Sequence, residues 1–472
     1  MTALRLLLAC SNIALIVAAE AAGAHGAPGG FTGLQAGAVS PFAAVVSWSD
    51  PAPGRAAVSY GLAHGSDALW ATAAKVGNHH TLRVGGLAPG SAYELHPHVR
   101  LAGGSLVSGP TVTVTTPRIR GPVTTAVDRD GDILLDGVRF FPVMQWLQCP
   151  SNFLANVKLG VNVFLGKGCS DTPDASEVAK LAALGAFSVI PYDASVRASA
   201  GLFGWRFDDE PDGNGKGPSV IAGEYRHNRA EDSAHINFLT VESNFDSEMS
   251  PPTISNGDRS VYRSYASATD AIGFDLYPII GWCRPDWIGR VADAQRELVD
   301  DYAGGRPTYQ WIEAASTSTQ SCKGRGPTPA ELRAEVWMAV VNGAKAVGYF
   351  THSWTPDYSQ FRVGVPVQAE MARTDRELRE LTPVLLGRKA RLAIAPAAPV
   401  DAIARSYRGA VYAFAVNTSR SRQRVTLRLP AAAGARAIVI DEGRSVRVSH
   451  GRLTDEFAPL AVHAYELPPP GF

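Results

Sequence analysis

The sequence lacks a net charge, long runs of like charge and a long apolar segment. Lys plus Arg and Asp plus Glu both number 44 among 472 residues, so the formal net charge is zero. There is then no overall field to attract nucleic acid or an anionic membrane surface, and the balance disfavours polyanion binding. Past the N-terminus no stretch is apolar enough for a membrane anchor, which argues against a membrane span.

Cysteine is scarce, with five in the chain. Cys10 falls within residues 1–24, which read as a secretory signal: Arg5 is basic, residues 6–17 are apolar, and small residues follow. We therefore predict a secreted protein, extracellular or periplasmic after signal removal. The other four cysteines are an even number in an exported chain, which favours disulfides over metal ligation. They are Cys149, Cys169, Cys283 and Cys322.

The length indicates two to four domains. Residues 31–117 show short alternating strands with turn signals, which predicts an N-terminal β-sandwich of about seven strands. Residues 388–472 return to alternating strands and predict a C-terminal β-sandwich. His79 and His80 are adjacent in a strand, so they point to opposite faces and do not form a metal pair.

Residues 125–387 predict a (β/α)8 barrel, a TIM barrel, because short apolar runs alternate with helix-like stretches. The first crossover is short, so its helix is the least defined. The expected helices are 174–184, 218–233, 258–269, 287–303 and 328–344. The expected strands are 141–147, 161–166, 187–193, 202–211, 235–243, 271–278, 307–314 and 346–354.

The four cysteines follow the first, second, sixth and seventh expected strands. Neighbouring strands then favour the pairs Cys149–Cys169 and Cys283–Cys322, each joining two adjacent loops at the barrel's C-terminal end. Three pairings remain open on counting alone.

Two glutamates stand where a barrel places chemistry, at the C-terminal ends of strands. Glu210 ends the fourth expected strand, in Asp208-Asp209-Glu210-Pro211, and Glu313 ends the seventh. Alone, the acidic run would be a turn. Two carboxylates facing each other across the barrel mouth are what glycosidic hydrolysis needs.

The segment His80–Leu95 resembles the late strands of fibronectin type III domains and of the N-terminal domain of purple acid phosphatases, which implies an accessory module. The barrel resembles the retaining clan A of glycoside hydrolases. That resemblance implies that Glu210 is the acid/base and Glu313 the nucleophile. It also implies that Tyr277 hydrogen-bonds the nucleophile and that Trp354 lies under the sugar.

One position departs from the clan: Asp209 stands where an Asn usually contacts the substrate 2-hydroxyl. An acidic neighbour can accept that hydrogen bond and raises the pKa of Glu210, which suits a general acid. Period two places Asp275 on the face of Tyr277, which makes Asp275 a further substrate-binding candidate, and it places Arg206 and Asp208 on the face of Glu210.

Further candidates lie near strand ends. Arg206 is a partner for buried carboxylates or a substrate contact, and His352 binds a hydroxyl or is a satisfied barrel histidine. Glu242 is a reserve catalytic carboxylate. Aromatic side chains suited to stacking on sugar rings are Trp146, Trp282, Trp287 and Tyr192.

The leading hypothesis is thus a secreted glycosidase that cleaves O-glycosidic bonds of a poly- or oligosaccharide with retention, without cofactor or metal. A non-catalytic carbohydrate- or cell-wall-binding protein on a degenerate barrel is the alternative. A metal-dependent barrel hydrolase is a third, although Gln145-Trp146-Leu147-Gln148 follows no His-x-His pattern. Sugar, linkage, endo or exo action and oligomeric state stay open.

Overall fold

The computed structural model describes residues 30–317, 324–430 and 436–472. The predicted signal, 1–24, and Cys322 lie outside these ranges. The chain divides into two compact units, one of residues up to 117 without 68–70, the other of residues 118–472 with 68–70.

The N-terminal unit is antiparallel β-structure. Its strands pair in the order β1-β2-β4-β5, with β3 on β2 and β6 on β4. Six strands thus form where about seven were expected, and the fibronectin type III likeness stays a prediction. The strands are β1 (Thr32–Ser40), β2 (Ala43–Leu62), β3 (Leu69–Gly85), β4 (Ala92–Leu101), β5 (Leu106–Ser108) and β6 (Val112–Thr115).

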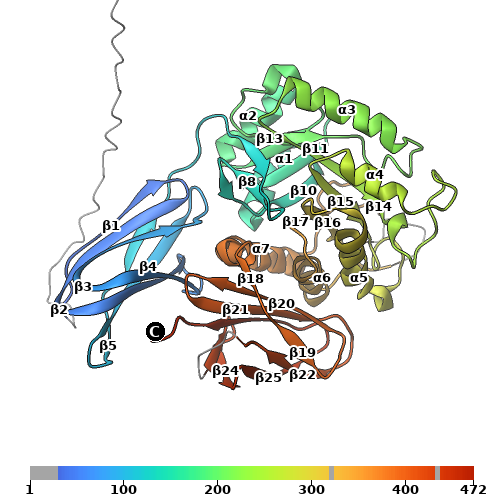
Figure 1. Cartoon of the computed structure of the whole chain (residues 1–472). Helices are drawn as coiled ribbons and strands as arrows, with labels where there is room; N and C mark the ends of the chain where they lie inside the picture. Colours follow the sequence, from blue (N-terminus) through green and yellow to red (C-terminus); the bar gives the residue numbers. More distant parts are fainter. Residues whose placement is uncertain (1–29, 318–323, 431–435) are drawn as a thin grey trace, which may run out of the picture. The chain divides into compact units, whose positions relative to one another are not determined.

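The second unit contains a closed barrel of eight parallel strands in sequence order (Figure 1). The predicted TIM barrel is confirmed, and each expected strand overlaps one that forms. They are β10 (Val143–Gln148), β11 (Val163–Lys167), β12 (Phe187–Ile190), β13 (Leu202–Arg206), β14 (Ile236–Glu242), β15 (Ala271–Asp275), β16 (Thr308–Glu313) and β17 (Ala346–Phe350).

Large aromatic rings that surround the Thr240 hydroxyl fill part of the barrel. Trp311 Nε1 donates to Thr240 Oγ1 at 3.2 Å, and the Tyr309 hydroxyl lies 3.0 Å from the same oxygen. A Cβ on Gly348 would lie 2.2 Å from the Trp311 ring, so the neighbouring strand must carry glycine there. The Trp311 ring of β16 therefore fits because the residue beside it on β17, Gly348, has no side chain.

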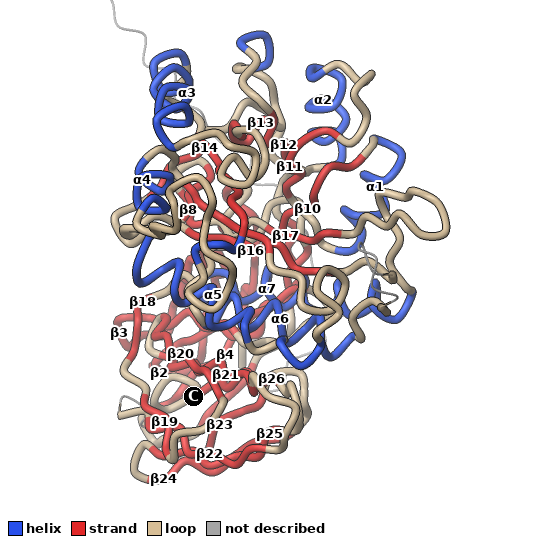
Figure 2. Tube along the Cα trace, turned by 90° about the vertical axis from the view of Figure 1, so that its right-hand side faces the viewer, coloured by secondary structure: helices blue, strands red, loops and turns tan. Residues whose placement is uncertain are grey.

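Helices lie outside the strands (Figure 2). The helix after the first strand, the least defined in the sequence, does form, with Pro150 in its first turn and left-handed Gly160 after it. The helices are α1 (Pro150–Leu159), α2 (Asp174–Leu184), α3 (Pro218–Glu231), α4 (Val261–Ser267), α5 (Arg290–Glu297), α6 (Pro329–Val341) and α7 (Val365–Leu385). Short helical turns are η1 (Ala194–Val196), η2 (Ser243–Phe245), η3 (Pro285–Trp287) and η4 (Leu298–Tyr302).

A small antiparallel sheet precedes the barrel, made of β7 (Thr125–Val127), β8 (Ile133–Leu135) and β9 (Val138–Arg139). The Thr125 hydroxyl donates to Phe203 O and accepts from Ile236 N, so this sheet is tied to β13 and to the start of β14. It therefore lies at the end of the barrel opposite to the strands' C-termini.

The C-terminal residues form a nine-stranded antiparallel arrangement that packs on the barrel's helices: Trp337 of α6 stacks on Phe414 at 5.4 Å between ring centroids. No helix in the described ranges is both long and apolar enough to span a membrane. The strands are β18 (Arg388–Ala390), β19 (Ala393–Ala395), β20 (Val400–Tyr407), β21 (Ala410–Asn417), β22 (Gln423–Arg428), β23 (Arg436–Val439), β24 (Arg444–Ser449), β25 (Arg452–Phe457) and β26 (Val462–Leu467).

Candidate active site

Glu210 lies in the loop after β13, four residues beyond the strand's end at Arg206. The sequence prediction carried this strand too far, to Pro211. The Glu210 N–H donates to Thr240 O of β14 at 3.1 Å, and its φ of 47° is left-handed. A non-glycine residue in this conformation is uncommon, and such outliers cluster at functional sites.

Glu210 contacts a second carboxyl that the sequence analysis had assigned to substrate. Burial raises the pKa of Asp275 well above its ordinary value, and a hydrogen bond with Glu210 raises it further. A hydrogen bond that raises the pKa of Asp275 stabilises its protonated form, so Asp275 donates and Glu210 accepts. This contact and the burial together favour the protonated form of Asp275.

Asp209 joins this group from the same loop and is half-buried. Burial and the charge of Glu210 raise the pKa of Asp209 to about 7, against the lowering effect of Arg206. Burial, more than the charge of Glu210, thus favours the protonated form of Asp209, and the predicted effect of Asp209 on Glu210 stays a prediction. Asp208 instead points outward and pairs with Lys216, so the predicted period-two face does not extend past Arg206.

Asp212 connects the loop after β13 to β14 and α4. It accepts hydrogen bonds from Tyr262 Oη at 2.7 Å and from Glu242 N at 3.1 Å. Burial raises the pKa of Asp212 to about 6. Burial and the charges of Asp212 and Glu210 raise the pKa of Glu242, the reserve carboxylate. Strands β13, β14 and β15 thus bring several acids to one end of the barrel.

Arg206 supplies positive charge beside these acids. Its guanidinium lies over the Trp146 ring, 5.2 Å from the centroid, and Trp146 packs against Trp311 at 5.5 Å. A Cβ on Gly166 would come within 2.4 Å of Arg206 Nη1. Glycine at the end of β11 therefore makes room for the guanidinium, and Arg206 acts on the acids as a partner from inside the barrel.

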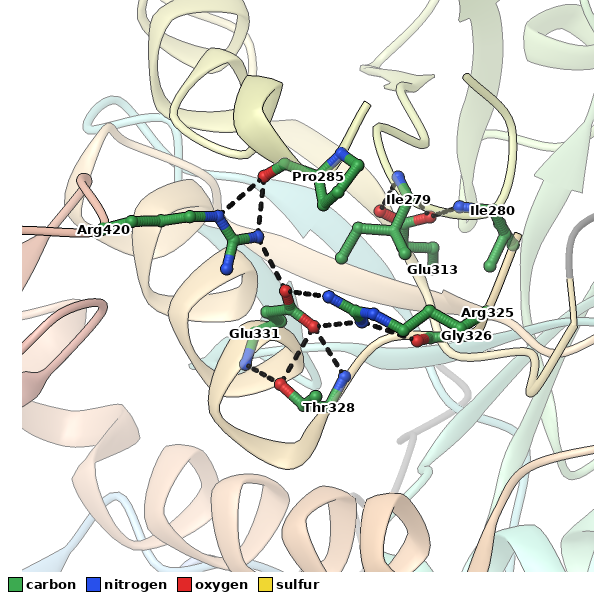
Figure 3. A network of polar contacts seen from close by, with 9 residues as sticks. All are labelled: Ile279, Ile280, Pro285, Glu313, Arg325, Gly326, Thr328, Glu331 and Arg420. Carbon is green, nitrogen blue, oxygen red and sulfur yellow. Dashed lines mark hydrogen bonds and ion pairs between the residues drawn. The ribbon is translucent and has the colours of Figure 1, made fainter. Parts of the chain in front are cut away.

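Glu313 ends β16 as predicted, but its carboxylate has other partners than Glu210. It accepts hydrogen bonds from Ile279 N at 2.8 Å and Ile280 N at 2.5 Å, both in the loop after β15 (Figure 3). Its side chain is fully buried. Burial raises the pKa of Glu313 to about 7 although these amides and Glu335 of α6 lower it.

Glu335 of α6 is the third partner of Glu313, after Ile279 and Ile280, and is also fully buried. Neither of its carboxyl oxygens receives a hydrogen bond from a described donor. Burial raises its pKa well above the ordinary value, as do the charge of Glu313 and a hydrogen bond with it. Glu335 therefore stays protonated and donates a hydrogen bond to Glu313.

A network of hydrogen bonds and ion pairs surrounds Glu331, which lies one turn before Glu335 on α6 (Figure 3). Arg325 contacts Glu331 through both terminal nitrogens, at 2.6 and 2.7 Å, and Thr328 completes a capping box with it. Arg420, from the loop after β21, donates to Glu331 and to Pro285 O, both at 2.6 Å. The C-terminal strands thus hold the loop that supplies the amides to Glu313.

Tyr277 stands between the two groups of acids, two residues past the end of β15. Its ring packs on Phe350 at 4.9 Å between centroids. Burial raises the pKa of Tyr277 well above its ordinary value, and the charges of Asp275, Glu210, Asp209 and Glu313 all raise it further. Carboxyls from three strands therefore act on one phenol.

The remaining predicted residues divide into packed and exposed. His352 Nε2 lies 2.9 Å from Leu147 O, and burial lowers its pKa, which is the satisfied-histidine alternative. Trp354 does not end β17, whose last residue is Phe350, but it stacks on Phe350 at 6.2 Å and is 50% exposed. Trp282 is 48% exposed.

Trp282 lies 6.2 Å from Trp287, ring to ring, in the loop after β15. Tyr192 instead packs on Trp205, with 5.0 Å between ring centroids, against a buried cluster that includes Val178 of α2. Trp282, Trp354 and Tyr358 are exposed and Trp287 is half-buried, all in loops past the strand ends.

The disulfide Cys149–Cys169 is present, with its Cα atoms 5.1 Å apart, and joins the loops after β10 and β11 as predicted. Cys283 follows β15. Its predicted partner Cys322 lies outside the described residues, so that pair stays a prediction.

A cluster of Asp128, Asp130 and Asp132 offers oxygens within 4.8 Å of one another. Arg139 pairs with all three, at 2.5 to 3.2 Å, and Lys345 pairs with Asp132 at 2.5 Å. These two cations already pair with the three acids, at the β7–β9 end of the barrel and away from the candidate site.

No protein-family model and no curated protein matches the chain. Solved structures do. Its structural neighbours are glycoside hydrolases. An α-amylase from Geobacillus thermoleovorans complexed with acarbose has 10% identity over 68% of this chain and 91% of that one, with a TM-score of 0.48. A putative α-galactosidase/melibiase from Bacteroides fragilis has 12% identity over 92% and 96%, with a TM-score of 0.46.

An endoxylanase from Clostridium papyrosolvens has 11% identity over 73% of this chain and 97% of that one, with a TM-score of 0.39. At such identities and scores, the neighbours assign neither a substrate nor a catalytic residue to this chain. The candidate site therefore rests on its own geometry.

Sequence reasoning missed several residues of the site. Ile279 and Ile280 act through backbone N–H groups, which no side-chain pattern reveals. Glu335 did leave a signal: Glu331 and Glu335 are two acids, four positions apart, in helix α6, whose remaining residues are apolar except for Arg333. Two acids on one buried helix face require partners, and that was readable.

Proposed function

We propose that this chain is a glycoside hydrolase in which Glu210 transfers protons and Glu313 is the second carboxylate. The observation that carries the proposal is the gathering of carboxyls from the ends of β13, β15 and β16 around the buried Tyr277, with Glu313 held by two backbone amides. Burial raises the pKa of Tyr277 most, and Asp275, Glu210, Asp209 and Glu313 raise it further. Two acid groups, from the ends of β13 and β16, that act on one residue suit a reaction needing a proton donor and an anion. Exposed Trp282 and Trp354 provide surfaces for sugar rings.

In the proposed reaction, Glu210 in its protonated form gives its proton to the glycosidic oxygen as the bond from that oxygen to the anomeric carbon breaks. The Glu313 carboxylate bonds to the anomeric carbon and forms an ester. Glu210 then takes a proton from water, and the hydroxide that remains displaces Glu313 from the sugar. The sequence conserves protons and consumes one water.

Asp275 holds the proton for the first step. Because Asp275 donates a hydrogen bond to Glu210, moving that proton across the bond would leave Glu210 as the acid and Asp275 as the anion. Glu313 must also exchange its bonds from Ile279 and Ile280 for the substrate, since its side chain is buried. We expect the loop after β15 to move when sugar binds.

The experiment is a glycan-library screen with the mature chain, followed by Glu210→Gln and Glu313→Gln on the substrate found. Each substitution should lower kcat/KM by at least about 100-fold and leave the melting temperature within a few degrees. The matched control is Glu231→Gln, an exposed glutamate at the end of α3, which should retain wild-type activity.

Proton NMR of the first product distinguishes the stereochemistry. A substrate complex should bring the Glu210 and Glu313 carboxyls to about 5–5.5 Å apart for retention, against about 6.5–9.5 Å for inversion. Wild-type turnover by Glu313→Gln would remove Glu313 from the mechanism. Binding without turnover across the library would favour a non-catalytic carbohydrate-binding protein. We also propose export, on the pattern of residues 1–24.

A further inference from the structure

The C-terminal strands carry a net positive charge that the zero charge of the whole chain conceals. Residues 388–472 contain thirteen Lys or Arg and six Asp or Glu, a formal charge of +7, so the rest of this neutral chain carries −7. The two charges are separated by domain. A polyanion would meet a positive field at one part of the molecule only.

Several of these arginines face each other on exposed strand positions. Arg428 of β22 lies opposite Arg452 of β25, and Arg436 of β23 lies opposite Arg447 of β24, with all four exposed. Like charges directly opposite in an antiparallel pair destabilise it. Two such pairs cost stability unless an anion compensates.

The protein itself supplies little compensation there. Across the described ranges, no carboxylate pairs with Arg428, Arg447 or Arg452 by the distances that define the other ion pairs. Farther along the same strands the situation is different, because Arg422 and Arg424 both pair with Glu456, at 3.4 and 3.6 Å. The unpaired charges are therefore local to one part of this surface.

A hollow of about 630 Å³ lies among these residues, at the β24–β25 hairpin. Ser449 pairs opposite Arg452 across the hairpin, and the two turn residues, His450 and Gly451, have φ of 51° and 68°. Two left-handed residues fix a tight two-residue turn, so the hollow is built on a defined hairpin. Its lining is Val446, Arg447, Ser449, His450, Arg452 and Thr454.

We propose that this hollow binds an anionic polysaccharide, one whose sugars carry carboxylate or sulfate groups. Arg447 and Arg452 line the hollow, and Arg428 lies opposite Arg452 on the neighbouring strand β22. Planar guanidinium groups match carboxylate and sulfate groups with paired hydrogen bonds. Ser449 and Thr454 add hydroxyls that can hydrogen-bond to sugar hydroxyls. The described residues that line the hollow include no Phe, Tyr or Trp, and stacking on aromatic rings is what single-stranded nucleic acid uses.

The test measures binding without turnover, so it does not depend on the barrel's chemistry. The full mature chain carrying Glu210→Gln is titrated with sodium polygalacturonate and dextran sulfate, and with a neutral xylan for comparison. The two polyanions should bind and the xylan should not bind through this surface. Affinity for the polyanions should fall as NaCl is raised.

The deciding comparison is between two double variants with equal change of charge in the same strands. Arg428→Gln/Arg452→Gln should weaken polyanion binding at least about tenfold, and adding Arg447→Gln should weaken it further. Arg422→Gln/Arg424→Gln, which removes arginines paired with Glu456, should change it by less than about twofold. The first variant should melt no lower than its parent, since it removes a like-charge pair.

Equal losses in the two double variants would overturn the proposal, because binding would then follow net charge alone. Absence of polyanion binding would also overturn it, as would equal, arginine-dependent binding of neutral xylan. Tighter binding of a DNA duplex or of phosphatidylglycerol vesicles, with the same dependence on Arg428 and Arg452, would assign the surface to those partners instead.

Discussion

Carboxyl side chains at the candidate site hold their protons according to the donors around them. Glu331 and Glu335 are one turn apart on α6. Burial acts to raise the pKa of Glu331, but hydrogen bonds from Arg325, Thr328 and Arg420 lower it to about 2. Glu335 meets another carboxyl instead of a cation, and its pKa is raised. The neighbour, and not depth alone, decides which form is present.

This contrast makes Glu335 a positioning residue for Glu313 under the proposed mechanism. Glu335→Gln keeps a hydrogen-bond donor toward Glu313, so the acid limb of the kcat/KM profile should stay within about 0.5 pH unit of wild type. Glu335→Leu removes the donor that lowers the pKa of Glu313. The acid limb should then move to higher pH, because Glu313 must be ionised to attack.

A pH–rate profile of the two variants checks this expectation, with melting curves alongside. A loss of activity in Glu335→Leu without movement of the acid limb would assign Glu335 a packing role only. An acid limb that moves equally in both variants would contradict the hydrogen-bond argument.

Among secondary-structure elements, the loop between β15 and α5 is the one most dependent on distant parts of the chain. It supplies the Ile279 and Ile280 amides to Glu313 and carries Tyr277 at its start. Arg420 holds its later part through Pro285 O. The C-terminal strands therefore contribute to the candidate site through one loop-to-loop contact.

Arg420→Ala should loosen this loop. It removes hydrogen bonds to Pro285 O and to the buried Glu331, although Arg325 still pairs with Glu331, so we expect a loss of about 1–2 kcal/mol in the free energy of unfolding. KM should rise more than kcat falls, because the exposed Trp282 lies in the same loop. Denaturant unfolding and steady-state kinetics measure both effects.

Arg422→Ala is the matched control for Arg420→Ala, since Arg422 lies two residues away and has an exposed pairing with Glu456. It should change neither quantity appreciably. Unchanged KM in Arg420→Ala, despite lower stability, would separate the contact from the candidate site.

The elements were predictable because their signals are local. Apolar runs alternating with helix starts gave all eight barrel strands, and the order of strands gave the Cys149–Cys169 pair. Strand ends were less predictable: β13 stops at Arg206 because Glu210 turns left-handed and its N–H bonds to β14. That contact links residues thirty positions apart, and no local pattern encodes it.

Side-chain partners across the barrel were the least predictable. Period two grouped Asp275 with Tyr277, but β15 ends at Asp275, and spacing could not reveal the contact of Asp275 with Glu210 from another strand. Spacing placed Glu313 at the end of its strand, but it could not reveal that the carboxylate would bind the loop after β15 and Glu335. Rotamer and loop conformation decide these contacts, and spacing determines neither.

For the whole molecule, the neutral total charge was the least informative number. It disfavoured polyanion binding, yet it results from +7 in residues 388–472 and −7 elsewhere. A second whole-molecule property follows from how many acids the fold buries. Burial raises the pKa of several carboxyls of the barrel: those of Glu177, Asp209 and Glu313 to about 7, Asp212 to about 6 and Asp375 to about 8.

These raised values predict that the fold is less stable at alkaline than at mildly acidic pH. A carboxyl with a raised folded pKa contributes its full stability below the unfolded pKa of about 4, and that contribution is lost as pH rises toward the folded value. Between pH 5.5 and 8 the unfolded chain has released protons that the fold still holds. Acids with lowered pKa, such as Glu331, reduce stability only below about pH 4.

Two histidines oppose this trend, since burial lowers the pKa of His98 and His352, but the acids outnumber them. We expect the melting temperature to be about 3–6 °C higher at pH 5.5 than at pH 8, by calorimetry in buffers of equal ionic strength. Asp375→Asn should reduce the difference, because Asn can still accept from Tyr349, whose hydroxyl lies 2.6 Å from Asp375, and has no proton to lose. A melting temperature that rises from pH 5.5 to 8 would mean that these acids are ionised in the fold, and the protonated forms of Asp275 and Glu335 would then have to be abandoned.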